Sequence, residues 1–203
     1  GSVHIQHVTT RRGVEIIRAA KDGGAPVTAE GCPHHFTLTD EAVREHGTNA
    51  KMNPPLRTQD DVQGIIEGLA DGTLDAIATD HAPHAADEKG EGMRAAPFGI
   101  IGLELCVPLT WTYLVRPGHL PEAEAVRKLT TVPAAILREE TPRLEVGGPA
   151  DITVIDPAMR LDVTPELLKS KSHNTPFLGT SLIGWPVLTI CGGRETFRRR
   201  DDA

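Results

Sequence analysis

Aromatic residues are scarce in this 203-residue chain: four Phe, two Trp and one Tyr make up 3% of it. Surfaces that bind single-stranded nucleic acid rely on such rings, because bases stack against them. A basic excess is missing too, since 21 Lys and Arg stand against 28 Asp and Glu, giving a formal net charge of -7. We therefore expect no nucleic-acid partner, because phosphate binding needs clustered positive charge.

Long apolar runs and paired cysteines are also absent. No stretch of eighteen apolar residues occurs, so the sequence predicts no membrane span. The cysteines are odd in number, lie far apart and form no CxxC pair: Cys32, Cys106 and Cys191. This pattern is typical of reduced thiols, and we expect a cytoplasmic protein.

What the chain does contain is a regular alternation of strand and helix patterns over its first 79 residues. The predicted strands are Val3–Val8, Val27–Cys32, Asn49–Asn53 and Asp75–Thr79. The predicted helices between them are Arg12–Lys21, Thr39–Glu45 and Asp60–Ala70. Such a series predicts an α/β fold whose parallel strands are joined by right-handed crossovers.

The remainder of the chain changes character twice. A polar loop over residues 81–96 is long enough to suggest a functional role. Helical patterns follow at Ile100–Val115 and Glu122–Thr131. The last quarter instead shows strand patterns at Asp151–Ile155 and Pro186–Cys191, with a Gly-Gly turn and a charged end over residues 194–203. We expect a small β-rich unit there, followed by a solvated tail.

Polar side chains collect where the predicted strands end. His7 closes the first strand, His34 follows the second, Asn53 ends the third, and Asp80 follows the fourth. In β/α barrels the carboxyl ends of the strands form the active-site face. Because two imidazoles and a carboxylate suit zinc and similar ions, His7, His34 and Asp80 are candidate metal ligands.

Each of these residues also has a plainer interpretation. His4 fits a structural hydrogen-bonding role, because strand alternation places it on the face opposite His7. We expect His35 to support or pack against the site. Asn53 could simply end a strand before two prolines, or its amide could recognise a cyclic amide, since it both donates and accepts. Residues 96–102 could be a helix start, or could offer backbone N–H groups to an oxygen of the substrate.

Together these segments resemble class I dihydroorotases of the amidohydrolase superfamily. Five site segments occur in the family's order, and two further matches follow them: HIQHVTT (4–10), CPHHFTLTDE (32–41), NAKMNPPLR (49–57), DAIATDHAPH (75–84), APFGIIGLE (96–104), GGPADITVIDP (147–157) and NTPFLG (174–179). The resemblance implies that residues 1–145 are the C-terminal half of a (β/α)8 barrel of the TIM type. Residues 146–203 would then be the C-terminal part of a small β domain and a tail.

The resemblance also implies a chemistry. Members of this family are binuclear zinc hydrolases that interconvert N-carbamoyl-L-aspartate and L-dihydroorotate in pyrimidine biosynthesis. By position, His7 and His34 would be zinc ligands, and Asp80 would be both a ligand and the catalytic acid/base. Four residues would contact the substrate, the last two through the loop backbone: Asn53, His84, Phe98 and Gly99.

The sequence departs from the family pattern in what it does not include. The HxH motif of the first barrel strand, the bridging lysine or aspartate, and the Arg and Asn that hold the substrate carboxylate are all absent. We expect two Zn2+ per complete site, fewer or none in this chain alone, and little catalysis without the N-terminal half. Open sheet edges predict self-association or a complementary half as partner.

Two alternatives remain open from the sequence. Another cyclic-amide hydrolase, of the allantoinase or hydantoinase type, is disfavoured by the combination of NPPLR and APFG. The second alternative belongs to a different class of function: the chain would be a non-catalytic, dihydroorotase-like partner of aspartate transcarbamoylase. Metal content would separate the dihydroorotase from this non-catalytic partner, because a complete enzyme holds zinc and a scaffold need hold none.

Overall fold

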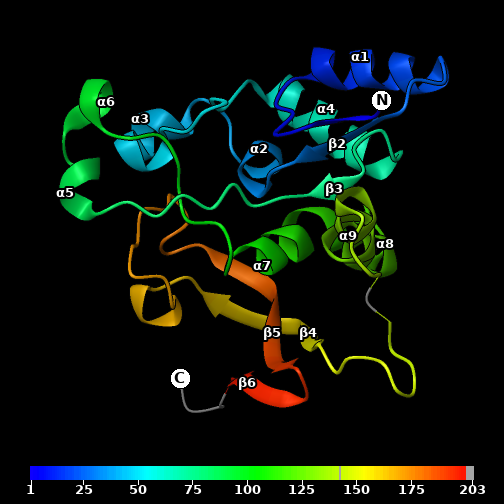
Figure 1. Ribbon diagram of the computed structural model, residues 1–203. Coiled ribbons are helices and arrows are strands. Elements are labelled where there is room, and N and C mark those ends of the chain that lie inside the picture. The colour runs from blue at the N-terminus through cyan, green and yellow to red at the C-terminus, as the bar shows by residue number, and fades with distance from the viewer. Residues whose placement is uncertain (142, 200–203) are drawn as a thin grey trace.

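The computed structural model describes residues 1–141 and 143–199 of the chain. Two three-stranded sheets organise it, one formed by the first half of the chain and the other by its last quarter (Figure 1). Helices cover the first sheet and fill the space between the two. The described residues form no closed barrel, so the predicted half-barrel has an open sheet.

The first sheet is parallel throughout and has the order β1-β2-β3. Its strands are β1 (Val3–Ile5), β2 (Val27–Gly31) and β3 (Ala76–Ile77), with Val3 paired to Val27 and Gly31 to Ile77. Because all three strands run in the same direction, the residues that follow them emerge at one edge. His7, Cys32 and Asp80 all lie just beyond that edge.

The predicted strand Asn49–Asn53 is wrong. A 3-10 helix, η1 (Gly47–Ala50), occupies its beginning, and β2 pairs directly with β3. Two consecutive prolines, Pro54 and Pro55, follow at once and have no backbone N–H to give to a ladder. The sheet therefore has three strands where the sequence pattern predicted four.

The predicted helices of this half are present with shifted ends, and one more is added. They are α1 (Arg11–Asp22), α2 (Pro33–Thr37), α3 (Ala42–His46) and α4 (Gln59–Ala70). Thr10 caps α1 by accepting a hydrogen bond from the Gly13 N–H at 3.0 Å. Helices α1 and α4 approach closely at Gly64, where a Cβ would lie 2.7 Å from the Cα of Arg11.

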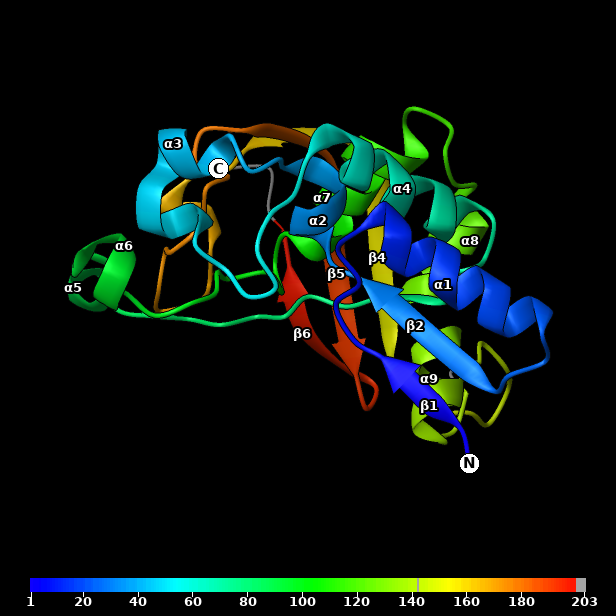
Figure 2. The same cartoon turned by 90° about the horizontal axis from the view of Figure 1, so that it is seen from above.

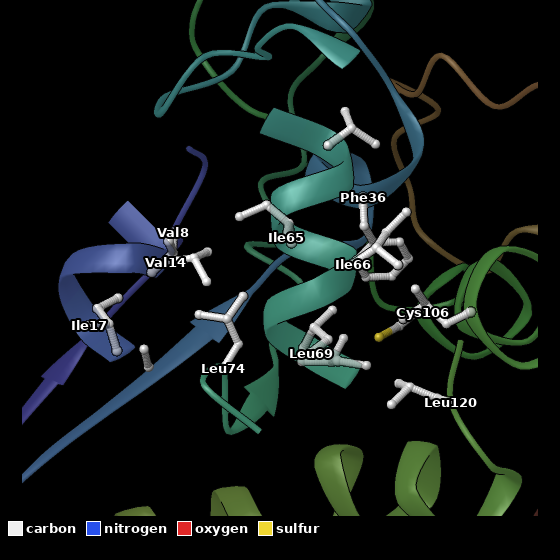
Figure 3. Packing of buried hydrophobic residues seen from close by; sticks show 14 residues of the cluster. Val8, Val14, Ile17, Phe36, Ile65, Ile66, Leu69, Leu74, Cys106 and Leu120 are labelled. Atoms are coloured by element: carbon white, nitrogen blue, oxygen red, sulfur yellow. The ribbon is translucent and has the colours of Figure 1, made fainter. Parts of the chain in front are cut away.

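The apolar faces of α1 and α4 pack against β2 and form the first core. Ile65 of α4 points toward Val14 of α1, whereas Leu69 lies on the side of α4 that faces Cys106, and these side chains are all buried (Figure 3). This core lies under the centre of the sheet and holds the strand ends in place. Burial of such side chains contributes roughly 1.5–3 kcal/mol each.

The segment after β3 is helical only in pieces. It contains α5 (Ala86–Lys89), α6 (Gly92–Ala95), α7 (Cys106–Thr110), the π-helix η2 (Trp111–Val115), α8 (Glu122–Leu129) and α9 (Thr131–Leu137). The predicted helix Ile100–Val115 begins only at Cys106. Its first residues are held elsewhere, because the Ile101 N–H donates to the carbonyl of Asn174 and the Gly102 N–H donates to His81 Nδ1.

The second sheet is antiparallel and has the order β4-β5-β6. It consists of β4 (Ile152–Asp162), β5 (Ser181–Cys191) and β6 (Arg194–Arg198), with η3 (Pro165–Leu167) between β4 and β5. The predicted hairpin turn at Gly192–Gly193 is confirmed. The prediction of a solvated tail is wrong for residues 194–198, which form a strand paired with β5, with Phe197 opposite Thr189, although only Phe197 among them is partly buried. Residues 200–203 lie outside the described part.

A second apolar core joins the two sheets. Leu182 and Trp185 of β5 pack with Ile100, Leu105 and Leu109 from the segment after β3. In Figure 1, α7 lies between the parallel sheet and β5. The β-rich quarter is therefore fixed to the half that carries the strand-end residues. In the described part of the chain, no helix is long and apolar enough to cross a membrane.

Candidate active site

His7 and Asp80 meet at the carboxyl edge of the parallel sheet. His7 Nε2 lies 3.7 Å from Asp80 Oδ1, with both side chains partly exposed. This separation exceeds a hydrogen bond and leaves room for an ion bound to both atoms at ~2.0–2.2 Å. Both residues have positive φ, 53° for His7 and 47° for Asp80. Such backbone strain at non-glycine residues clusters at functional sites.

His34 lies beneath this pair, in the first turn of α2. Its side chain is buried, and its Nε2 has no hydrogen-bond partner among the described residues. Burial lowers the pKa of His34 well below its usual value, and the neighbouring His35 and His7 lower it further. The ring is therefore neutral, which is the form that binds a metal. In the described part of the chain, the ligand atoms of His7, His34 and Asp80 do not all lie within 4.8 Å of one another, so the structure brings the three predicted ligands only partly together.

Glu30 is a site residue that sequence reasoning missed. It lies buried on β2, with Oε1 2.9 Å from His7 Nδ1 and Oε2 3.0 Å from His4 Nε2. Glu30 Oε1 makes no hydrogen bond within the described part of the chain, so its approach to His7 is a close polar contact without hydrogen-bond geometry. The available signal was a carboxylate within an otherwise uncharged central strand.

The expected placement of His4 on the face opposite His7 is wrong. Both histidines reach Glu30, and His4 Nδ1 lies 2.8 Å from the Thr28 hydroxyl. Strand alternation does not extend to His7, because β1 ends at Ile5 and His7 has a positive φ. The hydrogen-bonding role expected for His4 matches these contacts.

Cys32 and His35 complete this group. The Cys32 sulfur lies 3.4 Å from His7 Nδ1, and burial raises the pKa of the thiol well above its usual value, with Asp80 and Glu30 adding to the effect. His35 Nε2 lies 3.1 Å from the Pro54 carbonyl oxygen, and burial lowers the pKa of His35 to about 4. We call the following six residues the histidine cluster: His7, Glu30, Cys32, His34, His35 and Asp80.

Three of the predicted substrate-binding residues form a second group. His84 Nε2 lies 3.0 Å from the carbonyl oxygen of Phe98, and the Gly99 N–H donates to the carbonyl of Lys51 at 2.9 Å. Lys51 Nζ lies 4.5 Å from the centre of the Phe98 ring, which is 55% exposed. The structure thus brings His84, Phe98 and Gly99 together.

Asn174 and Lys89 hold this second group in place, and sequence reasoning assigned them no role. The Asn174 amide donates to the carbonyls of Ala82 and Gly99 at 2.9 and 3.2 Å, and its oxygen accepts the His84 N–H at 3.2 Å. Lys89 is buried, and its Nζ donates to the carbonyls of Pro97 and Gly99, both at 3.0 Å. We call the following residues the loop cluster: Lys51, His84, Lys89, Phe98, Gly99 and Asn174.

Asn53 stands apart from both groups. It is exposed, and no hydrogen bond holds its side chain within the described part of the chain. A cavity of about 610 Å³ lies beside the loop cluster and is lined in part by His84, Lys89 and Asn174. The predicted site residues therefore fall into a metal-suited group, a hydrogen-bonded loop, and one unengaged amide.

A parallel β/α sheet with imidazole and carboxylate groups at its carboxyl edge is the arrangement of α/β proteins that carry their site at the strand ends. Residues 2–196 match the model of the Amidohydrolase family. The chain belongs to the amidohydrolase family.

Curated proteins similar in sequence to this chain include dihydroorotases. The chain is 54% identical over 199 residues to the dihydroorotase of Syntrophotalea carbinolica, covering 98% of this chain and 47% of the relative. It is 52% identical over 198 residues to that of Pelotomaculum thermopropionicum, covering 98% and 46%. The chain spans about half the length of these relatives, which is consistent with the predicted C-terminal half.

Solved structures that resemble this chain include hydantoinases and dihydropyrimidinases. The L-hydantoinase of Arthrobacter aurescens superposes with a TM-score of 0.87 at 27% identity, covering 98% of this chain and 45% of that one. The dihydropyrimidinase of Brevibacillus agri gives a TM-score of 0.90 at 23% identity, with the same coverage. The predicted fold class is thereby confirmed.

Proposed function

We propose that this chain forms the C-terminal part of a dihydroorotase. In the completed protein, it would contribute to the reversible hydrolysis of L-dihydroorotate to N-carbamoyl-L-aspartate. The observation that carries the proposal is the approach of the strained His7 and Asp80 to 3.7 Å at the carboxyl edge of an amidohydrolase sheet. The identity of about half of all positions with dihydroorotases supports this substrate over hydantoins.

The residues present suit a divalent metal ion. Within residues 1–141 and 143–199, His34 Nε2 is buried without a hydrogen-bond partner, and Glu30 lies against the far nitrogen of His7. His7, His34 and Asp80 are the residues that would hold the ion, and zinc matches two imidazoles and a carboxylate. When bound, such an ion polarises an amide carbonyl and lowers the pKa of water. Two Zn2+ in the complete site, and fewer in this chain alone, stay predictions.

Asp80 is suited to moving the proton. Its side chain is about one-third exposed, so a substrate can reach it. The carboxylate would accept a proton from the attacking water and deliver it to the ring nitrogen that leaves. In the direction of ring closure, the same group would run the transfer backwards.

The loop cluster and Asn53 would hold the substrate. The Asn53 amide is free to donate and accept, as a cyclic amide requires. His84 would exchange its contact with the Phe98 carbonyl for a substrate oxygen. Both backbone polar groups of Gly99 are used within the protein, so a substrate contact there requires the loop to shift.

The rest of the active site would come from the missing half of the barrel. Figure 2 shows β1 at the border of the parallel sheet, with no strand beyond it. A groove of about 470 Å³ runs along β1 and α1, and its lining includes the exposed apolar side chains of Val3, Ile5 and Ile16. We propose that the N-terminal half docks here and that the chain self-associates without it. Association with aspartate transcarbamoylase and a cytoplasmic location also stay predictions.

Complementation tests the proposal. The chain is produced alone and together with the part of the Syntrophotalea carbinolica dihydroorotase that it does not match, and ring opening of dihydroorotate is followed by ultraviolet absorbance. We expect turnover only in the combined sample. Asp80→Asn should reduce it by about 10²-fold or more, whereas His119→Gln, at an exposed position, should leave it unchanged. A combined sample that hydrolyses hydantoin but not dihydroorotate would contradict the proposal.

A further inference from the structure

A second set of metal-suited atoms lies beside the His7–Asp80 pair. Cys32, His34 and His35 are all buried, and the sulfur and one nitrogen from each ring lie within 4.8 Å of one another. Cys32 is the N-cap of α2, and both histidines lie in that helix's first turn. One short stretch of backbone therefore positions all three groups.

One ring nitrogen of each histidine is buried without a partner in the described part of the chain. Neither His34 Nε2 nor His35 Nδ1 has a hydrogen-bond partner among the described residues, although both are buried. The contact of His35 Nε2 with the Pro54 carbonyl places the ring proton on Nε2, so Nδ1 carries a lone pair. Buried polar atoms without partners cost stability, and their persistence points to a ligand.

The chemistry of the set differs from that of the His7–Asp80 pair. A thiolate with two imidazoles favours thiophilic ions such as Zn2+ and Cd2+, whereas a carboxylate favours harder ions. A tetrahedral ion bound at ~2.3 Å to sulfur and ~2.0 Å to nitrogen keeps its ligand atoms roughly 3.5 Å apart. Side-chain shifts on the order of 1 Å would therefore close the set around an ion.

We propose that Cys32, His34 and His35 form a binding site for a thiophilic divalent cation, separate from the ion held by His7 and Asp80. Because His34 belongs to both sets of ligands, an ion bound to Cys32 withdraws His34 from the catalytic centre. An excess of Zn2+ or Cd2+ therefore inhibits the completed protein. This inhibition rests on the proposed function, whereas the binding site itself does not.

Cadmium binding tests the site directly. The metal-free chain carrying Cys106→Ser and Cys191→Ser retains Cys32 as its only thiol, and is titrated with Cd2+ while the thiolate-to-cadmium charge-transfer band is recorded. We expect a saturable band at one equivalent. Adding Cys32→Ser should abolish the band, and His35→Phe should weaken the affinity by at least about tenfold. Asp80→Asn should retain the band, and His119→Gln, at an exposed position, is the control that should leave both the band and the affinity unchanged.

Three outcomes would overturn the proposal. They are the absence of a band, an unchanged affinity in His35→Phe, and loss of the band in Asp80→Asn, which would assign the thiol to the catalytic centre.

Cadmium NMR on the unaltered chain provides a second measurement that does not depend on whether the variants fold. Its resonance should lie in the range of mixed sulfur and nitrogen ligands, and a shift typical of nitrogen and oxygen alone would refute the site. A normal cadmium band with an inactive complemented protein would refute the proposed function and leave this site standing.

Discussion

The histidine cluster and the loop cluster lie on the same side of one sheet but are held in opposite ways. In the loop cluster, Gly99, Lys89 and Asn174 satisfy one another through hydrogen bonds of 2.9–3.2 Å. In the histidine cluster, buried nitrogens of His34 and His35 have no partner among the described residues, and His7 and Asp80 have strained backbones.

The difference separates structural from chemical roles. A network that satisfies its own polar groups stabilises the chain, and removing one member leaves the others unpaired. A group of neutral, unpaired imidazoles gains its missing interactions only when a ligand binds. Substitutions in the loop cluster should therefore cost stability, and substitutions in the histidine cluster should cost metal binding.

The largest loss of stability is expected from Gly99→Ala. The residue has φ +112°, and a Cβ would lie 2.4 Å from the Cβ of Ala82. Backbone strain and overpacking together should cost about 3–4 kcal/mol in the free energy of unfolding. Gly92→Ala is the matched control, because Gly92 also has a positive φ but no atom within 4 Å of a Cβ, and it should cost about 1–2 kcal/mol. Urea denaturation that gives equal losses would show that the contact with Ala82 is not tight.

Acidification should destabilise the metal-free chain through the histidine cluster. The pKa of His35 falls from 6.5 to about 4 on folding, so between these values the unfolded chain binds more protons than the folded one. Stability is therefore complete above pH 6.5 and lost as the pH falls toward about 4, by up to ~3 kcal/mol from His35 alone. His35→Phe should flatten the dependence of the urea midpoint on pH. The exposed His119→Gln should retain the full slope, and an unchanged slope in His35→Phe would contradict the assignment.

Asn174→Ala should remove the centre of the loop cluster. The His84 N–H and the carbonyls of Ala82 and Gly99 would lose their partner, which should cost about 2 kcal/mol in the free energy of unfolding. Asn53→Ala is the control, because Asn53 is exposed and should change stability by less than ~0.5 kcal/mol. In the complemented protein, we expect Asn53→Ala to raise KM without changing stability. Equal losses in the free energy of unfolding for Asn174→Ala and Asn53→Ala would contradict a stabilising role of Asn174 in the loop cluster.

The smallest effect on stability is expected from His34→Phe. The ring is buried and its Nε2 has no partner in the part of the chain that the structure describes, so an apolar ring of similar shape should change the free energy of unfolding by no more than about 1 kcal/mol. Zinc bound by the complemented protein should nevertheless fall when measured by atomic emission. A loss of stability as large as that of Asn174→Ala would mean that His34 is structural.

The positions of His7, His34 and Asp80 after the strands could be predicted from the sequence, whereas the grouping of His34 with Cys32 and His35 was not. His7, His34 and Asp80 each follow an apolar strand pattern, and parallel strands bring such positions to one edge. Glu30 was not predicted, because a single carboxylate inside a strand does not reveal which neighbours it will reach. The strand at Asn49–Asn53 was wrongly predicted, because a short apolar run before two prolines does not specify whether it joins a sheet.

The sequence alone determined the α/β order, the positions of α1 and α4, and the strand-end residues, because local periodicity and chain direction decide these features. Only the tertiary structure decided that Asn174, from the β-rich quarter, would hold the loop around Gly99, more than seventy residues earlier in the chain. It also decided that β6 would pair with β5 although its sequence is strongly charged. Contacts between distant segments depend on how two cores pack together, and no local pattern carries that information.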